Sequence, residues 1–284
     1  MKIAITGATG QLGRIVVEKL KAKGDNKKIV AIVRSKQKAE DLGVEAREAD
    51  YDKPESLDIA LSNVDTLVLI SSSEVGKRAI QHKNVINAAK NAGVKHIVYT
   101  SLLHADRSSL GLAGEHMETE ETLKNTGIPY TILRNGWYTE NYESAITSAQ
   151  AMGGFFGSAA KGKISAAPRA DYAEAIVSVV TSEGHTGKTY ELGGDDAFTL
   201  KQLAEEVSRQ TGKELPYTDL PSDEYRTSLV KAGLPEPVAN MFAGIDVSIS
   251  MGNLYDNSHQ LSKLISRPTT PLKEVISEMI KKNK

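Results

Sequence analysis

A glycine-rich turn close to the N-terminus constrains this chain more than any other feature. Gly7-Ala8-Thr9-Gly10-Gln11-Leu12-Gly13 follows a short apolar run, Ile3–Thr6, and opens an amphipathic segment, Gly13–Lys23. In a strand–turn–helix unit such glycines let the backbone approach a pyrophosphate, and the helix N-terminus presents free N–H groups to the phosphates. A plain connection between a strand and a helix is the alternative. The position of the motif, within a β–α–β unit of about thirty residues, favours a dinucleotide site.

The residues that follow continue this alternation of apolar strands and amphipathic helices. Strands are predicted at residues 29–33, 45–49, 66–70, 96–100 and 130–133. Helices are predicted at residues 36–42, 54–61, 80–92 and 113–125. Strands that are apolar on both faces and alternate with helices predict a parallel sheet covered on both sides. The predicted fold class is therefore α/β, with a Rossmann-type doubly wound parallel sheet.

The pattern becomes less regular after residue 135. Short strands within loops are predicted at 152–157 and 162–168, a further strand at 189–192, and helices at 171–180, 199–210, 223–232 and 272–281. Pro235 and Pro237 are interpreted as residues that interrupt regular structure after the helix at 223–232. We assign residues 1–155 to a dinucleotide-binding Rossmann domain and residues 156–284 to a smaller C-terminal α/β lobe. Some strands and helices of that lobe are expected to return to the first domain.

The composition excludes several classes of function. The chain has no cysteine, which excludes disulfides, thiolate nucleophiles and iron–sulfur clusters. A net charge of −1 argues against broad nucleic-acid binding. No apolar run approaches the roughly twenty residues of a membrane span, and the N-terminus does not resemble a signal peptide. We therefore expect a cytoplasmic protein, and we predict no metal site because no two histidines have a metal-ligand spacing.

The end of the second strand carries a residue that distinguishes between cofactors. Arg34 lies twenty-one residues after Gly13, where an NAD site usually has an acidic side chain for the ribose 2′-hydroxyl. An arginine suits the 2′-phosphate of NADP(H) instead, because its planar guanidinium pairs with phosphate in a fork geometry. Lys36 and Lys38 add positive charge nearby. A solvated arginine on a loop is the alternative.

Two further strand ends carry polar side chains. Asp50 ends the third strand, where its carboxylate could accept from the adenine amino group or could simply cap the helix that begins at Pro54. Ser71-Ser72-Ser73 ends the fourth strand. Ligands of such sheets lie beyond the carboxyl ends of the strands, so we expect these serines to line the cofactor channel.

The residues that short-chain reductases use for proton transfer are missing. Those enzymes usually carry Tyr-x-x-x-Lys after the fifth strand, where the tyrosine gives a proton and the lysine lowers the tyrosine pKa. Here Ala113 and Met117 hold these two positions. His104 and His116 lie in the right region, although either can equally be a surface or core histidine. The chain also has no nucleophile elbow and no Walker motif.

Several longer segments carry a resemblance that spans almost the whole chain. They are ITGATGQLG (5–13), IVAIVR (29–34), LISSSEVG (69–76), YTSLLHAD (99–106), LRNGWY (133–138), ENY (140–142), RADY (169–172), YELGG (190–194) and SKLI (262–265). With these segments the chain resembles the NmrA-like branch of the atypical short-chain dehydrogenases/reductases, and within it the bacterial type 2 NADPH:quinone oxidoreductases. The Asn-Gly-Trp-Tyr and Leu-Leu-His-Ala-Asp segments are far more specific than the glycine motif. Loss of the Tyr-x-x-x-Lys pair is typical of this branch.

The resemblance implies a Rossmann domain, a smaller lobe and a cleft between them. The turn at residues 7–12 would hold the pyrophosphate, Arg34 the 2′-phosphate, and Ser71–Ser73 would lie along the ribose. Arg169 would reach in from the later segment. The loop that would fold over the nicotinamide is Asn135-Gly136-Trp137-Tyr138-Thr139-Glu140-Asn141.

The implied activity is direct hydride transfer from NADPH to a quinone, without a flavin. Negative charge develops on a quinone oxygen as hydride arrives, and a hydrogen-bond donor aimed there would help. His104, Tyr138, Asn141 or a water could supply that donor. Hydroquinone oxygens are much weaker bases than an alkoxide. A missing tyrosine acid is thus tolerable for a quinone in a way that it would not be for a ketone.

Two other readings stay open at this point. Some NmrA-like proteins are redox-sensing modules that read the NADP⁺/NADPH ratio and dock a transcription regulator, so this chain could be a binding module rather than an enzyme. A reductase of another unsaturated or azo-type acceptor would differ only in substrate. We expect a small-molecule quinone substrate, no nucleic-acid partner and a homodimer.

Overall fold

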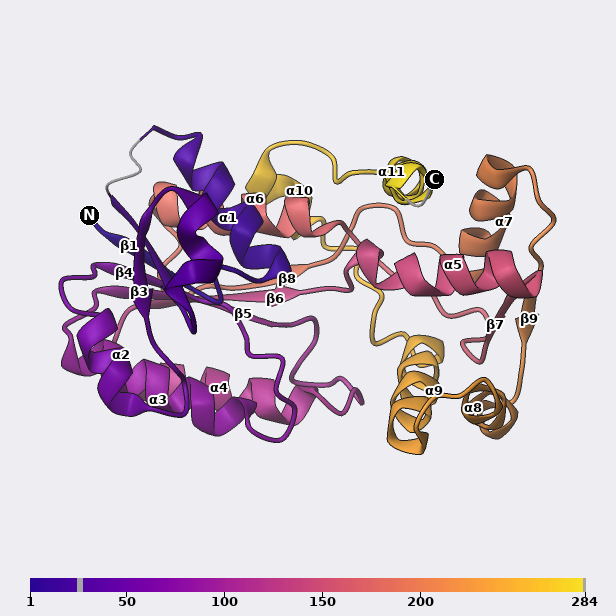
Figure 1. Ribbon diagram of the computed structural model, residues 1–284, viewed down its shortest axis with the longest axis horizontal. Coiled ribbons are helices and arrows are strands. Elements are labelled where there is room, and N and C mark those ends of the chain that lie inside the picture. Colours follow the sequence, from indigo (N-terminus) through magenta and orange to yellow (C-terminus); the bar gives the residue numbers. More distant parts are fainter. Residues whose placement is uncertain (25–27, 283–284) are drawn as a thin grey trace.

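The computed structural model describes residues 1–24 and 28–282, and a parallel sheet forms its centre (Figure 1). Among these residues, seven strands lie in the order β3-β2-β1-β4-β5-β6-β8. They are β1 (Ile3–Thr6), β2 (Ile29–Val33), β3 (Glu45–Glu48), β4 (Thr66–Leu69), β5 (His96–Leu102), β6 (Tyr130–Asn135) and β8 (Thr189–Leu192). Every neighbouring pair is parallel, so the strands end at one common edge. The α/β doubly wound fold predicted from the sequence is confirmed.

Helices cover both faces of the sheet, because its strands are apolar on both sides. On one face α1 (Gln11–Lys21) packs against α6 (Arg169–Thr181), and α6 packs against α10 (Gln260–Ile265). The other face carries α2 (Pro54–Ala60), α3 (Arg78–Asn91) and α4 (Ala113–Thr126) (Figure 1). Each layer has its own buried apolar cluster, one containing Val16 and Ile176 and the other containing Ile86 and Leu123.

A second group of elements lies beyond the carboxyl ends of the strands, on the right in Figure 1. It has its own apolar core, which includes Phe155, Leu203 and Ile276. Strands β7 and β9 pair in parallel within it. Its elements are α5 (Glu143–Met152), β7 (Phe155–Gly157), α7 (Leu200–Thr211), β9 (Tyr217–Asp219), α8 (Ser222–Lys231), α9 (Glu236–Ser250) and α11 (Leu272–Lys282). The chain crosses back in between, since α6, β8 and α10 lie with the large sheet.

The elements that sequence patterns did not predict lie mainly in this second group. Pro235 and Pro237 were interpreted as punctuation of a loop, but α9 begins at Glu236 with proline in its first turn. Proline is favoured there because its missing N–H would be unpaired anyway. The strand predicted within 162–168 is reduced to isolated bridges at Ile164 and Ala167. The 36–42 segment is a 3₁₀ helix. No helix in the described part of the chain is long and apolar enough to cross a membrane.

Candidate active site

A cavity of about 960 Å³ runs along the carboxyl ends of six neighbouring strands. Each strand contributes lining residues at or just beyond its last residue. In the order of the sheet these include Asp50 (β3), Arg34 (β2), Gly7 (β1), Ser71 (β4), Leu102 (β5) and Asn135 (β6). Open α/β sheets bind ligands at this edge. The cavity is therefore the candidate active site.

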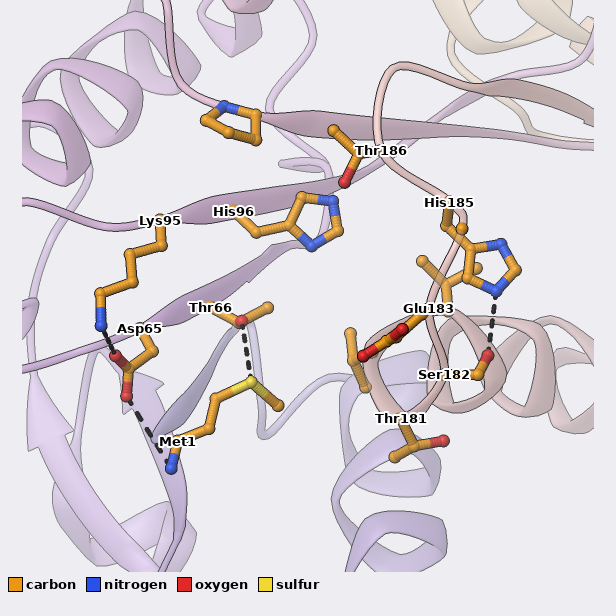
Figure 2. Close-up of a pocket in the computed structure, with 14 residues that line it drawn as sticks. Met1, Asp65, Thr66, Lys95, His96, Thr181, Ser182, Glu183, His185 and Thr186 are labelled. Atoms are coloured by element: carbon orange, nitrogen blue, oxygen red, sulfur yellow. Dashed lines mark hydrogen bonds and ion pairs between the residues drawn. The ribbon is translucent and has the colours of Figure 1, made fainter.

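A second cavity, of about 810 Å³, lies at the opposite end of the strands. Figure 2 shows Met1, Asp65 and Lys95 at its wall, where Asp65 accepts from Lys95 Nζ at 2.6 Å. His96 and His185 also line it. None of the site residues predicted from the sequence lines this cavity. Its walls come from the starts of β4 and β5, which is the edge where such sheets do not bind cofactors.

The glycine-rich turn has the close backbone approach that its sequence predicts. Gly7 has a φ of +59°, which favours glycine, and its carbonyl accepts the Gly10 N–H at 2.8 Å. A Cβ atom on Gly13 would lie 2.2 Å from the Gly7 oxygen, so the first turn of α1 can pack here only without a side chain. No side chain caps α1, which leaves its first amides available to a phosphate. Ala8 is buried under the turn, while Thr9, Gly10, Gln11 and Leu12 line the cavity.

The basic end of the cavity is open to solvent. The Arg34 side chain is 77% exposed and pairs with Glu74 across the cavity, with 3.3 Å between Nη1 and Oε1. Arg14 and Lys38 also line this end, and Arg14 donates to the Lys38 carbonyl at 2.7 Å. A phosphate bound between Arg34 and Lys38 would replace Glu74 as the partner of Arg34. The geometry thus leaves an exposed basic corner, lined by Arg14, Arg34 and Lys38, for an anion.

Asp50 does not cap the following helix. The residue before α2 is Lys53, and α2 has no side-chain cap. Instead Asp50 Oδ1 accepts from the backbone N–H of Asp52 at 3.0 Å, and the carboxylate lines the cavity. Tyr51, which the sequence did not single out, also lines it, and burial raises the pKa of its hydroxyl. Asp50 is therefore placed where a purine ring could meet it.

The serine loop after β4 is held by the start of α3. The Ser72 N–H donates to His82 Nε2 at 2.9 Å, and the Ser72 hydroxyl donates to Gln81 Oε1 at 2.6 Å. Arg78 Nε donates to the Ser72 carbonyl at 2.7 Å. Burial, followed by the charges of the neighbouring histidine and arginine, lowers the pKa of His82 to about 3, which leaves a neutral acceptor for the amide. Ser71, Ser72 and Ser73 all line the cavity.

The loop after β6 closes the far end of the cavity. The Arg169 guanidinium lies 4.5 Å from the centre of the Tyr138 ring and donates to Asn141 Oδ1 at 2.9 Å. Asn135 Nδ2 donates to the Tyr138 hydroxyl at 3.3 Å, and burial raises the pKa of that hydroxyl. Asn135, Tyr138, Asn141 and Arg169 line the cavity together with Gly136 and Trp137.

Two residues of this loop point elsewhere. Thr139 is 2% exposed, and its backbone N–H donates to the Ala167 carbonyl. Glu140 accepts the backbone N–H of Arg169 at 2.9 Å and lies 3.4 Å from its Nη1. Neither lines the cavity. They fix the loop and Arg169 rather than facing a ligand.

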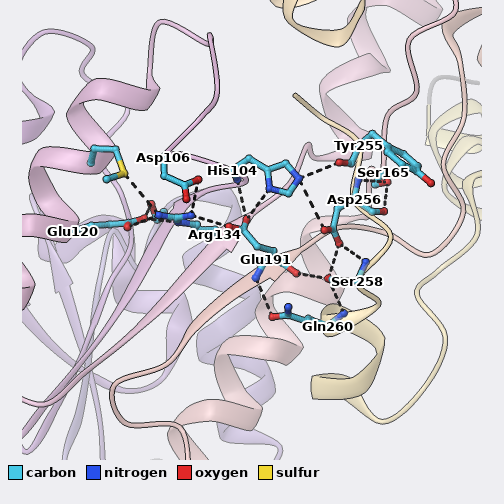
Figure 3. Close-up of polar contacts among 12 residues, drawn as sticks. His104, Asp106, Glu120, Arg134, Ser165, Glu191, Tyr255, Asp256, Ser258 and Gln260 are labelled. Carbon is cyan, nitrogen blue, oxygen red and sulfur yellow. Dashed lines mark hydrogen bonds and ion pairs between the residues drawn. The ribbon is translucent and has the colours of Figure 1, made fainter. Parts of the chain in front are cut away.

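His104 lies outside the cavity lining, in a buried polar network (Figure 3). Its Nε2 is 3.0 Å from the Tyr255 carbonyl and its Nδ1 is 3.5 Å from Glu191. Burial lowers the His104 pKa, but the Glu191 carboxylate and the Tyr255 carbonyl outweigh it, so the net shift is upward. Both ring nitrogens are thus engaged between β8 and the segment before α10. The structure does not bring His104 to Tyr138 and Asn141.

The lining residues fit a dinucleotide. The turn offers backbone amides and the basic corner offers cations, which together suit phosphates. At the other end, Asn135 Oδ1 is buried and has no hydrogen-bond partner among residues 1–24 and 28–282. An unpaired buried acceptor costs about 1–3 kcal/mol, and a ligand amide in the cavity would satisfy it. A carboxamide-bearing ring at this end would supply a donor to this buried acceptor.

Known proteins share the whole of this architecture. The family model described as the NmrA-like family matches residues 1–277. Quinone oxidoreductase 2 of Escherichia coli is 54% identical over 284 residues, covering 99% of both chains. The crystal structure of the E. coli NADPH-dependent quinone oxidoreductase with NADPH has a TM-score of 0.95 and covers 98% of this chain and 99% of that one. A Citrobacter triphenylmethane reductase complexed with NADP(H) is 40% identical, with a TM-score of 0.93, and the match covers 98% and 100% of the two chains.

Proposed function

The chain belongs to the NmrA-like family, and we infer that it is an NADPH-dependent quinone oxidoreductase. One observation carries this function. The chain is identical at about half of all positions, over its full length, to an E. coli enzyme of that activity. The crystal structure of that enzyme with NADPH has the same fold. The cofactor is NADPH and the substrate is a quinone. The resemblance predicted from the sequence is confirmed.

We propose that the cofactor lies along the cavity in the order of the sheet. The amides of residues 7–12 would hold the pyrophosphate, Arg34 with Lys38 the 2′-phosphate, and Asp50 the adenine amino group. The Ser71–Ser73 loop would lie along the ribose. The carboxamide of the nicotinamide would donate to Asn135 Oδ1, beneath the loop that Arg169 clamps.

The nicotinamide of NADPH supplies a hydride, which carries two electrons and one proton, and a second proton from water completes the hydroquinone. The protein contributes positioning, because holding donor and acceptor at reacting distance removes much of the entropic barrier. Leu102, Leu112 and Trp137 give the lining an apolar wall for a quinone ring. No flavin is needed for this direct transfer.

Tyr138 and Asn141 are the proposed donors to the substrate. The Tyr138 hydroxyl accepts from Asn135 and, with its raised pKa, keeps a hydrogen to donate. Asn141 Oδ1 is occupied by Arg169, which leaves the Asn141 amide hydrogens for a ligand. A donor aimed at an oxygen that gains negative charge lowers the barrier. His104 was predicted as a third donor, but its ring nitrogens are engaged elsewhere.

Mixing the protein with NADPH and a benzoquinone, and following absorbance at 340 nm, tests the function directly. We expect NADPH oxidation well above the protein-free rate, without added flavin. Equal or tighter binding of NADP⁺ without turnover of any quinone would instead favour the redox-sensing module. A triphenylmethane dye and an azo dye in parallel assays would measure how far the acceptor range extends.

Arg34→Ala is expected to raise the KM for NADPH about ten- to a hundredfold and to leave the KM for NADH nearly unchanged. The reason is loss of a charge-assisted contact to the 2′-phosphate, worth about 1.5–3 kcal/mol. The matched control is Lys36→Ala, because Lys36 is exposed but does not line the cavity. An equal loss of NADH and NADPH turnover would contradict the assignment of Arg34 to the 2′-phosphate.

We propose that the protein acts as a homodimer in the cytoplasm. Light scattering on the purified protein measures the first, with one chain per particle as the outcome that rejects it. Fractionation of cells that express the chain measures the second.

A further inference from the structure

His116 occupies the part of the site where the sequence lacks a proton donor. It lies on α4, between the positions of Ala113 and Met117, and is 4% exposed. Helical spacing places residues 113, 116, 117 and 120 on one side of α4. Although buried, His116 lines the cavity, together with Ser101 and Leu112. The imidazole thus sits in the half of the cavity formed by β4, β5 and β6.

The orientation of the His116 ring is fixed by Tyr99. The Tyr99 hydroxyl lies 2.7 Å from His116 Nδ1, and Tyr99 is fully buried in the sheet core. Since the two nitrogens lie on different sides of the ring, Nε2 points away from this core. Nε2 has no hydrogen-bond partner among the described residues, and it is not fully enclosed by protein atoms. It therefore faces the cavity, where a ligand can reach it.

The neighbouring hydrogen bonds fit a His116 tautomer that carries its proton on Nε2. His82 Nε2 accepts from the Ser72 N–H, so its Nδ1 donates to Thr119, and Thr119 passes its own hydrogen to the Glu115 carbonyl. With the Tyr99 hydroxyl as the donor, His116 Nδ1 accepts its hydrogen at 2.7 Å. This arrangement leaves the single imidazole hydrogen of a neutral His116 on Nε2.

His116 is neutral at ordinary pH. Burial, with a smaller contribution from the charge of Arg78, lowers its pKa to about 3. Arg78 itself is used elsewhere, since it donates to Glu115 at 2.8 Å and to the Ser72 carbonyl. Next to His116, the Ser101 hydroxyl donates to Glu120 at 2.7 Å, so it can only accept from a ligand. His116 therefore supplies a donor to this wall and Ser101 supplies an acceptor.

We propose that His116, oriented by Tyr99, is a catalytic residue that donates a hydrogen bond from Nε2 to the quinone oxygen that becomes negative. This proposal rests on the proposed function. The two electrons and one proton of the hydride move from NADPH to the quinone, giving NADP⁺ and a hydroquinone anion. Water then protonates that anion, and His116 keeps its own proton throughout. The neutral imidazole thus replaces the missing Tyr-x-x-x-Lys pair as an oxyanion donor rather than as an acid.

Single-turnover oxidation of bound NADPH at saturating benzoquinone tests this role. His116→Phe removes the donor and keeps a ring, and we expect a transfer at least about a hundredfold slower, as for loss of one oxyanion donor. His116→Gln retains an N–H group and should recover at least half of that loss on a logarithmic scale. Tyr99→Phe leaves the ring unoriented and should fall between wild type and His116→Phe. In all three variants we expect the NADPH Kd to stay within about threefold of wild type.

The controls separate this role from a structural one. His96→Phe changes a half-buried histidine at the opposite end of the sheet and should leave the transfer rate unchanged. A transfer rate for His116→Phe within twofold of wild type would overturn the proposal, as would a His116→Gln variant as slow as His116→Phe. If His116→Phe does not fold, a transfer rate for Tyr99→Phe within twofold of wild type would overturn the proposal. A wild-type protein that oxidises no NADPH with any quinone would reject the proposed function itself.

Discussion

Gly13→Ala is expected to weaken NADPH binding at least about a hundredfold. The added Cβ would lie 2.2 Å from the Gly7 oxygen and 2.8 Å from the Ala8 Cα. Both are backbone atoms, so the phosphate turn itself must move away from the first turn of α1. Displaced amides lose charge-assisted hydrogen bonds of about 1.5–3 kcal/mol each, and two such losses exceed a factor of a hundred. The crowding itself should cost a further 1–3 kcal/mol or so of stability.

Titration of protein fluorescence with NADPH, together with urea unfolding, measures both effects. Gly114→Ala is the matched control, because a Cβ there meets no atom within 4 Å and lies on α4. In an exposed helix position alanine stabilises by up to about 1 kcal/mol over glycine. Wild-type NADPH affinity in Gly13→Ala would show that the turn does not depend on this close approach.

Arg134→Leu is expected to destabilise the protein by about 3–5 kcal/mol. Arg134 is 6% exposed and forms 2.8 Å contacts with both Glu120 and Glu191, as Figure 3 shows. Glu120 is fully buried, and without Arg134 its remaining partners among the described residues are the Ser101 hydroxyl and Lys124 at 3.7 Å. Removal of one partner leaves a buried charge poorly compensated, which is what makes such a change costly.

Urea unfolding of three variants tests this ion pair. Arg226→Leu removes an exposed pair with Glu236 and should cost less than about 1 kcal/mol. The double variant Arg134→Leu with Glu120→Leu removes both charges and should recover part of the lost stability. A loss below 1 kcal/mol for Arg134→Leu alone is incompatible with a buried charge at Glu120. The network also joins β6 to β8, so its loss should loosen the edge of the sheet beside the site.

The fold was largely readable from the sequence because its signals are local. The strand Ile29–Val33 has the predicted bounds, and Gly127 ends α4 in the left-handed conformation. The second group of elements was harder to predict from the sequence. Its helices α5 and α9 were not predicted from the sequence. Proline at the start of α9 then resembled a loop signal.

Some residues of the candidate site were also predictable from the sequence, and others were not. The turn, Arg34 and the serine loop follow strand ends, so position along the chain predicts that they meet. Arg78 and Gln81 were missed, because their only sequence signal is a place at the start of a helix. The sequence placed both His104 and His116 in the right region but named only His104 as a donor, and contacts from distant segments reverse that choice. Tyr255 and Glu191 engage His104, while Tyr99 turns His116 toward the cavity.

The sequence by itself determined the doubly wound sheet, the glycine turn and a cofactor with a 2′-phosphate. These depend on periodicity and on short motifs, which act through neighbours along the chain. Only the tertiary structure decided which polar side chains face the cavity and which are held in buried hydrogen-bond networks away from it. That outcome depends on hydrogen bonds between segments far apart in sequence, such as the 151 positions that separate His104 from Tyr255. Gly13 illustrates both kinds of information. The sequence shows it as part of a local motif, and the structure shows why a glycine is required there, because a side chain would collide with the Gly7 oxygen across the turn.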